Sequence, residues 1–190
     1  MCREVEKPLP FTLPFREMTK PELRKYFQWF MDVLPQRVDE LGRTVKKTPG
    51  FAVWEPDFTP ESLDMLGEWF AGEVEIRSRT REEIQTIQSN LAFPIDVKTW
   101  DLSDRTFCIA GDVGMYFSQV LLRNHPSLRW DQPFGSRRYA EFGQPVIAGF
   151  GAVQLNPMRI VSVLAYSFAE KTKDSTALRK VYEVWSADIG

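Results

Sequence analysis

The residues best placed to do chemistry lie in a long apolar stretch, residues 103–131. Asp112 stands there among apolar residues, and a carboxyl group held away from water can gain a raised pKa and act as a general base. The same carboxylate can instead accept hydrogen bonds from Tyr116, one helical turn further on, or from another element. It can also lie in a solvated polar seam. Pairing or solvation is commoner than catalysis and is favoured here.

Four side chains of this region are candidates for a small-molecule pocket: Asp112, Tyr116, Trp130 and Arg138. Aromatic rings with a few converging charged groups make such sites, and an arginine can grip a carboxylate or phosphate. The alternative is an ordinary sheet core with charged residues at its rim. A pocket, and an enzyme built on it, therefore requires these four side chains to converge on one cavity.

The other reactive residue types are scarce. His125 is the only histidine, and at a helix exit an imidazole commonly satisfies the last carbonyls or faces water. One histidine and two unspaced cysteines predict no metal site. Cys2 and Cys108 are expected to be free thiols in a reducing cytoplasm. No glycine-rich nucleotide fingerprint is present, so we expect no cofactor.

A segment whose charged residues are all acidic is a candidate for a protein-binding site. Residues 48–76 contain seven acids and no lysine or arginine. Glu61, Asp64 and Glu68 lie on the side of a predicted helix opposite its apolar face. Such a segment can steer a basic protein partner, chiefly by raising the association rate. The commoner explanation is a solvated helix face.

The element that must position the first group of residues is a helix beginning after Ser103, a favoured N-cap. Two adjacent apolar stripes leave it little polar surface, which predicts burial among other elements. Gly111 and Gly114 weaken an isolated helix, which suggests that another backbone packs closely there.

Further helices are predicted from caps and apolar spacing. A capping box at Thr19–Glu22 opens a helix that keeps its stripe in phase across Pro35. A second box, at residues 80–83, opens a short helix with Ile84, Ile87 and Leu91 directed inward. Helices are also expected after residues 59, 156 and 174.

Strands are predicted at residues 127–132, 139–142 and 145–150. The result is an α+β fold: a mainly helical single domain over residues 1–190, with a long buried central helix and a small antiparallel sheet or hairpin. Residues 1–18, rich in proline, are expected to form an irregular segment packed on this domain.

Composition narrows the function classes. A net charge of −2 lacks the basic footprint of nucleic-acid binders. No apolar run is long enough to span a bilayer, and the N-terminus lacks the apolar core of a signal peptide. We therefore expect a cytoplasmic protein without nucleic-acid or membrane partners, and its oligomeric state is open.

The run GDVGMYFSQVLLRNHPSLRW resembles small bacterial proteins of unknown function that carry an Asp-Val/Ile-Gly-x-Tyr-Phe helix. In these proteins an Asn-Pro-Leu-x-Trp-like start of a strand follows, and some relatives are immunity proteins for secreted toxins. Ser118-Gln119 replaces the Gly-Glu of that pattern, so the role of that glutamate does not carry over. The resemblance implies a bacterial cytoplasmic domain with an immunity role.

Together these observations favour a non-enzymatic binding protein with a basic protein partner. The alternative is a small-molecule-binding domain or enzyme with its pocket near Asp112, Tyr116, Trp130 and Arg138.

Overall fold

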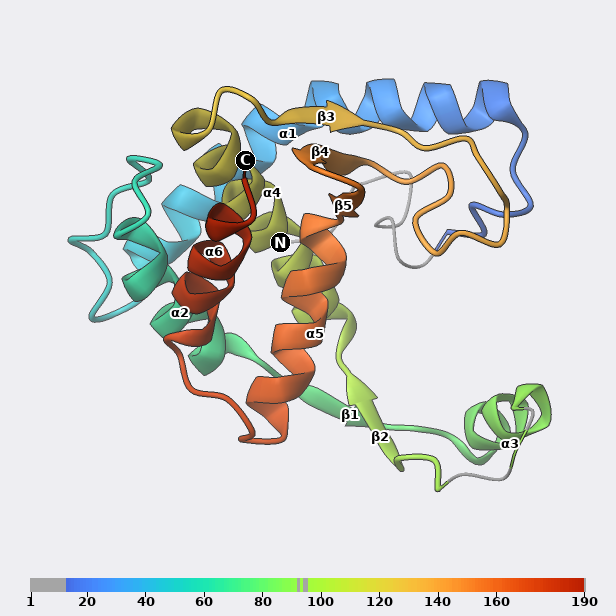
Figure 1. The fold of residues 1–190 in the computed structure, drawn as a ribbon. Coiled ribbons are helices and arrows are strands. Elements are labelled where there is room, and N and C mark those ends of the chain that lie inside the picture. The colour runs from blue at the N-terminus through green and yellow to red at the C-terminus, as the bar shows by residue number, and fades with distance from the viewer. Residues whose placement is uncertain (1–12, 92, 94–95, 190) are drawn as a thin grey trace.

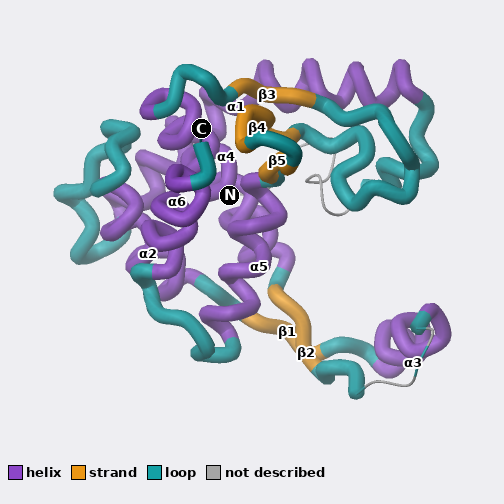
Figure 2. Tube along the Cα trace, in the orientation of Figure 1, coloured by secondary structure: helices purple, strands orange, loops and turns teal. Residues whose placement is uncertain are grey.

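The computed structural model describes residues 13–91, 93 and 96–189, and Figures 1 and 2 show how their helices and strands are arranged. In chain order the elements are α1 (Lys20–Lys47), α2 (Ser62–Glu73), β1 (Ile76–Ser78), α3 (Arg81–Asn90), β2 (Trp100–Leu102), α4 (Asp104–Asn124), β3 (Arg129–Asp131), β4 (Val146–Phe150), β5 (Val153–Leu155), α5 (Pro157–Ala169) and α6 (Ala177–Ala187). The fold is α+β and mainly helical, with two small antiparallel sheets, which confirms the predicted class.

Helix α4 lies at the centre of the fold, as its apolar sequence predicts. It packs against α1, α2, α5 and α6, and side chains such as Val113 and Phe117 are fully buried. Gly114 permits a close approach of α5, because a Cβ there would stand 2.8 Å from the Cα of Met158. The predicted close backbone contact is therefore confirmed at Gly114.

Capping residues begin the helices where the sequence predicts. Thr19 and Glu22 form a capping box at the start of α1. The Ser103 hydroxyl and the Asn156 side chain each accept a backbone hydrogen bond in the first turn of α4 and α5. Pro35 lies inside α1, which continues past it as one helix to Lys47.

Strands β3, β4 and β5 form an antiparallel sheet with β4 in the middle. The prediction of a strand at residues 139–142 is wrong, because those residues form turns. The third strand is instead β5, which follows β4 after a turn containing Gly151 at φ +67°. Three residues are too few to show the alternation that identifies a strand.

Strands β1 and β2 form a separate two-stranded ribbon that carries α3 away from the other helices (Figure 1). We call residues 76–102 the arm. The prediction that Ile84, Ile87 and Leu91 point inward is wrong, because α3 contains no buried residue and these three side chains are only partly buried. None of them belongs to the hydrophobic core.

The core is one cluster of buried side chains drawn from α1, α2, α4, α5 and α6 together with the larger sheet. The assignment of residues 1–190 to a single domain stays a prediction. Residues 1–12 of its N-terminal segment lie outside the described residues.

Candidate functional site

Asp112 forms a buried ion pair with Arg37 across the contact between α4 and α1. The guanidinium Nε and Nη2 donate to separate carboxylate oxygens, each at 2.7 Å, and the two side chains are 11% and 15% exposed. Burial raises the pKa of Asp112 to about 6, and the charge and hydrogen bonds of Arg37 offset only part of that rise. The predicted alternative of pairing with another element is confirmed.

Tyr116, one turn further along α4, joins that helix to α2 and the segment before it. Its hydroxyl lies 2.7 Å from Ser62 Oγ and accepts the Phe58 backbone N–H at 3.1 Å. Its ring stacks on Phe58, with 5.2 Å between the ring centroids. Burial raises the pKa of Tyr116, so the phenol acts here as a neutral structural hydrogen-bonding group.

Trp130 and Arg138, the other two pocket candidates, lie in different surroundings. Trp130 on β3 packs edge-on against Phe30 of α1, with ring centroids 5.2 Å apart. Its buried indole Nε1 has no hydrogen-bond partner within the described part of the chain. Arg138 is exposed in the turns that follow β3.

Two surface hollows are lined by other residues. One lies along α6 and the turn before it, and the second lies between residues 13–17 and residues 140–144, beside Arg159. Neither contains any of the four pocket candidates. The structure therefore surrounds these four side chains with separate neighbours and brings them to neither hollow.

His125 joins the C-terminal end of α4 to α6. Its Nε2 lies 3.1 Å from both Tyr182 Oη and Ser186 Oγ. The imidazole therefore bonds to side chains of α6 and not to the last carbonyls of α4, and it remains partly exposed. The hydroxyl partners belong to α6, 57 and 61 positions further along the chain, so no local pattern reveals them.

Cys108 is disulfide-bonded. The expectation of a free thiol is wrong for this residue, and Cys2 lies outside the described residues. Disulfides persist in oxidising compartments, so the cysteine chemistry does not support the prediction of a cytoplasmic protein.

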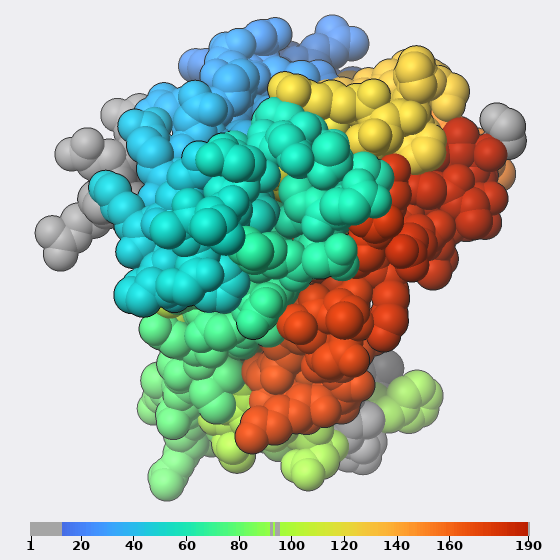
Figure 3. Space-filling view, turned by 90° about the vertical axis from the view of Figure 1, so that its left-hand side faces the viewer, coloured from blue at the N-terminus to red at the C-terminus, as the bar shows by residue number. Residues whose placement is uncertain are grey.

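The acidic candidates lie on α2, which packs beside α6 on the face seen in Figure 3. Glu61 is paired with Arg179 of α6 at 3.1 Å. Hydrogen bonds, first from the backbone and then from Arg179, hold its pKa below the usual value. Asp64 and Glu68 are exposed, and neither forms an ion pair with a described residue.

Three of the four flanking acids form ion pairs with described residues, and Asp57 accepts hydrogen bonds from Thr59. Glu55 pairs with Lys46 at 2.6 Å, and Arg105 pairs with both Glu73 and Glu75. The predicted acidic face therefore reduces to Asp64 and Glu68, which we call the acidic pair.

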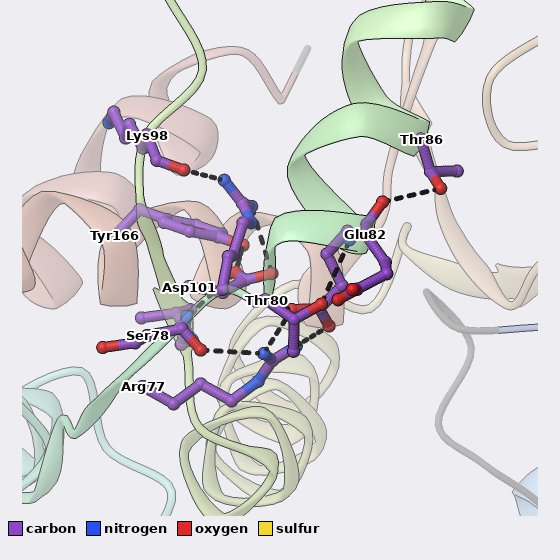
Figure 4. Close-up of polar contacts among 11 residues, drawn as sticks. Arg77, Ser78, Thr80, Glu82, Thr86, Lys98, Asp101 and Tyr166 are labelled. Carbon is purple, nitrogen blue, oxygen red and sulfur yellow. Dashed lines mark hydrogen bonds and ion pairs between the residues drawn. The ribbon is translucent and has the colours of Figure 1, made fainter.

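A polar cluster at the base of the arm was not predicted. Asp101 on β2 forms an ion pair with Arg79 at 3.1 Å and accepts the hydroxyl proton of Tyr166 on α5 at 2.5 Å (Figure 4). Burial, and then the hydrogen bond to Asp101, raise the pKa of Tyr166. The alternation of Arg77, Arg79 and Arg81 is a period-two signal for a strand and could have located this ribbon.

Within the described ranges, no helix is both long and apolar enough to cross a membrane. The same residues contain no group of three or more histidine, cysteine or acidic side chains that could hold a metal ion. No protein-family model, curated protein or solved structure matches the chain.

Proposed function

We propose that this protein is a non-enzymatic binding protein whose acidic pair engages a basic protein partner. The supporting observation is that Asp64 and Glu68 lie one turn apart on an exposed face of α2, a helix that contains no lysine or arginine. Like charges at this spacing destabilise a helix by roughly 0.2–0.5 kcal/mol. Asp64 lies in the first turn, where the helix dipole favours an acid, so the support for the proposal is that both carboxylates are exposed and form no ion pair with a described residue.

Two exposed carboxylates act mainly on the rate of association. Complementary charge steers a partner to the correct face, and this contribution weakens as salt screens it. The partner is therefore expected to present lysine or arginine side chains toward α2. A toxin-immunity role in a bacterium, which the resemblance over residues 112–130 implies, is one form of this proposal.

The alternative pocket gains no support from the same geometry. The polar atoms of Asp112 and Tyr116 are engaged by Arg37 and by Ser62 together with the Phe58 backbone. Cytoplasmic location stays part of the proposal, and the disulfide at Cys108 is the observation against it.

The test compares two variants that lose the same charge. Asp64→Asn/Glu68→Gln neutralises the acidic pair, and Glu17→Gln/Asp39→Asn removes two exposed acids elsewhere. Tagged wild-type protein is used to capture a basic protein from a lysate of the source cells at low salt, and that protein is then purified.

We expect the acidic-pair variant to associate with the purified partner about tenfold more slowly. The control should associate at nearly the wild-type rate, and high salt should bring all three rates together. Equal rates for the wild type and the acidic-pair variant at low salt would show that α2 is not the contact surface. Failure to enrich any basic protein would count against the proposal as a whole.

A further inference from the structure

Five cationic side chains gather where the start of α1 meets the loop between β3 and β4, at the right of Figure 1. The two segments are joined by Gln132, whose amide donates to the Leu23 carbonyl at 2.7 Å. The Arg137 guanidinium donates to the backbone carbonyls of Arg16 and Met18. All five side chains are exposed, and none forms an ion pair with a described residue. We call them the basic face: Arg16, Lys20, Arg24, Arg137 and Arg138.

The charge of the basic face is not neutralised by its surroundings. Residues 13–24 and 132–140 contain these five cations and two acids, Glu17 and Glu22, so their local charge is +3 against −2 for the whole chain. The Glu22 carboxylate accepts two hydrogen bonds from Thr19 at the start of α1. Glu141, just beyond this region, is paired with Arg159 at 2.6 Å. The face therefore attracts anions, although the rest of the chain is net acidic.

Contacts within the chain hold the basic face in position. Lys20 Nζ and Arg24 Cζ lie 6.0 and 5.8 Å from the centre of the Phe134 ring, within the range of a cation–π interaction. Phe134 belongs to a loop, residues 133–143, that is closed at its neck by a backbone hydrogen bond of 2.8 Å between its end residues. Because both segments are ordered before binding, a ligand there costs less conformational entropy.

A hollow adjoins the basic face and shares Arg16 with it. It lies between residues 13–17 and 140–144 and has a volume of about 400 Å³, which we call the loop hollow. Glu17, Gln144 and Arg159 complete its polar lining, so cations outnumber acids there. A hollow of this size is within the range of ligand pockets. Its apolar lining is Leu13, Pro14, Phe15, Ala140 and Phe142.

We propose that the basic face and the loop hollow bind an acidic peptide segment of a protein partner. The carboxylates of the segment meet the cations, and an apolar side chain beside them enters the hollow. Four of the five cations are arginines, whose guanidinium matches a carboxylate with two hydrogen bonds. Tyr139, next to Arg138 in the loop, is 40% exposed, and tyrosine and arginine are enriched at the energetic centres of protein interfaces.

The extent of the basic face favours a peptide over a larger polyanion. A nucleic acid or an anionic membrane would extend past the face and meet the net acidic remainder of the chain, which repels it. A compact acidic segment avoids that repulsion. The acidic pair lies on α2, at the opposite side of Figure 1, so this binding stands or fails separately from the proposed function.

The first measurement is selection of a displayed library of random peptides against the full-length protein at low salt. We expect the enriched peptides to carry acids beside an aromatic or aliphatic residue. The most enriched peptide is then synthesised with a fluorophore, and its dissociation constant is measured by fluorescence anisotropy. The affinity should fall as salt is raised, and replacing the apolar residue of the peptide by serine should weaken binding about tenfold.

Variants of the protein locate the binding surface. Arg24→Gln/Arg138→Gln removes two charges of the basic face and should raise the dissociation constant about tenfold. Arg43→Gln/Arg81→Gln removes two exposed arginines elsewhere that form no ion pair with a described residue. This control should leave the dissociation constant within about twofold of wild type.

A second pair of variants tests the hollow without changing charge. Ala140→Trp fills the loop hollow from an exposed lining position and should weaken binding about tenfold, whereas Ala52→Trp, at an exposed turn outside it, should not. Circular dichroism should show the wild-type helix content for all four variants, since every altered side chain is exposed.

Several outcomes would overturn the proposal. Enriched peptides without acids, or equal affinity for the wild type and Arg24→Gln/Arg138→Gln, would show that the basic face does not bind acidic peptides. Tighter binding of a single-stranded oligonucleotide with the charge of the peptide would assign the face to nucleic acid instead. Self-association at low salt that Asp64→Asn/Glu68→Gln abolishes would assign it to a second copy of this chain. With the proposal correct, that last variant binds the peptide as the wild type does.

Discussion

The pair Arg37–Asp112 shows how burial and charge oppose each other at a single contact. Removing two ions from water costs several kcal/mol per ion, and their attraction repays this only when the geometry is good. Here the geometry is bidentate, yet burial still raises the pKa of Asp112 to about 6. The pair therefore specifies how α1 meets α4 more than it stabilises that contact.

Arg37→Met should be more damaging than removal of both charges. It leaves the Asp112 carboxylate buried without its cation, which costs about 3–5 kcal/mol at pH 7. The double variant Arg37→Met/Asp112→Leu should restore most of that loss or exceed the wild-type free energy of unfolding. Urea denaturation of the wild type, both single variants and the double variant gives the coupling energy.

The pH dependence of these variants follows from the direction of the shift. Because the pKa of Asp112 is raised in the folded state, its protonation stabilises the protein below about pH 4, and this contribution is lost as pH rises through 6. The Arg37→Met penalty should therefore shrink between pH 7 and pH 5, since the carboxyl then becomes neutral. A penalty that stays constant or grows toward pH 5 would contradict the raised pKa.

For each of these ion pairs, the sequence indicates one of the two side chains but not its partner. Asp112 is conspicuous as an acid among apolar helix positions, but its partner Arg37 lies 75 positions earlier, on a helix whose own pattern does not distinguish it. The acidic pair was predicted together with Glu61. Arg179, which neutralises Glu61, comes from α6, 118 positions away.

Among the elements, helices were predictable because their signals are local. The caps Thr19, Thr80, Ser103 and Asn156 act within one turn of their helices, and each begins a helix in the structure. The three-residue strands β2 and β5 carry no comparable signal, and β1 has only the short arginine alternation, since their pairing depends on partners elsewhere in the chain. The spacing of Ile84, Ile87 and Leu91 predicts a helix, but it does not indicate which part of the molecule packs against their side chains.

The contact between α4 and α5 depends on a missing side chain, and Gly114→Ala should separate the two helices. The new Cβ would stand 2.8 Å from Met158 Cα and 3.0 Å from its backbone nitrogen. Such overpacking typically costs 1–3 kcal/mol, and the roughly 1 kcal/mol gain in helix propensity offsets part of it.

Gly72→Ala on α2 is the matched control, because nothing lies within 4 Å of the added Cβ. It should raise the free energy of unfolding by up to about 1 kcal/mol. Thermal unfolding of the two variants should therefore shift in opposite directions. A stabilising Gly114→Ala would mean that α4 and α5 are less closely packed than described.

The molecule as a whole combines a cohesive core, to which Leu102 of β2 belongs, with an arm whose helix α3 lies outside that core. The core cluster draws on five helices, whereas α3 contributes no buried residue. Stability that depends on buried apolar area should therefore reside in the core. Regions with few buried contacts are also the first to open locally, so exchange of α3 amides should be faster than that of α4 amides.

This division predicts that the arm is dispensable for folding. Arg79 N–H donates to the Thr99 carbonyl at 2.8 Å, so the ribbon is already closed at that point. Replacing residues 80–98 by Asn-Gly keeps the strands β1 and β2 joined by a favoured two-residue turn. The buried contacts of Arg79 and Asp101 remain, and the exposed pair of Lys98 with Glu170 is worth about 0–1 kcal/mol.

The shorter loop also lowers the entropy of closing the ribbon, by about 2 kcal/mol for this change in length. We therefore expect the free energy of unfolding to be unchanged or raised by about 1 kcal/mol, with helix content reduced only by the share of α3. Urea denaturation followed by circular dichroism measures both. A loss above about 3 kcal/mol would show that α3 stabilises the core of its own chain.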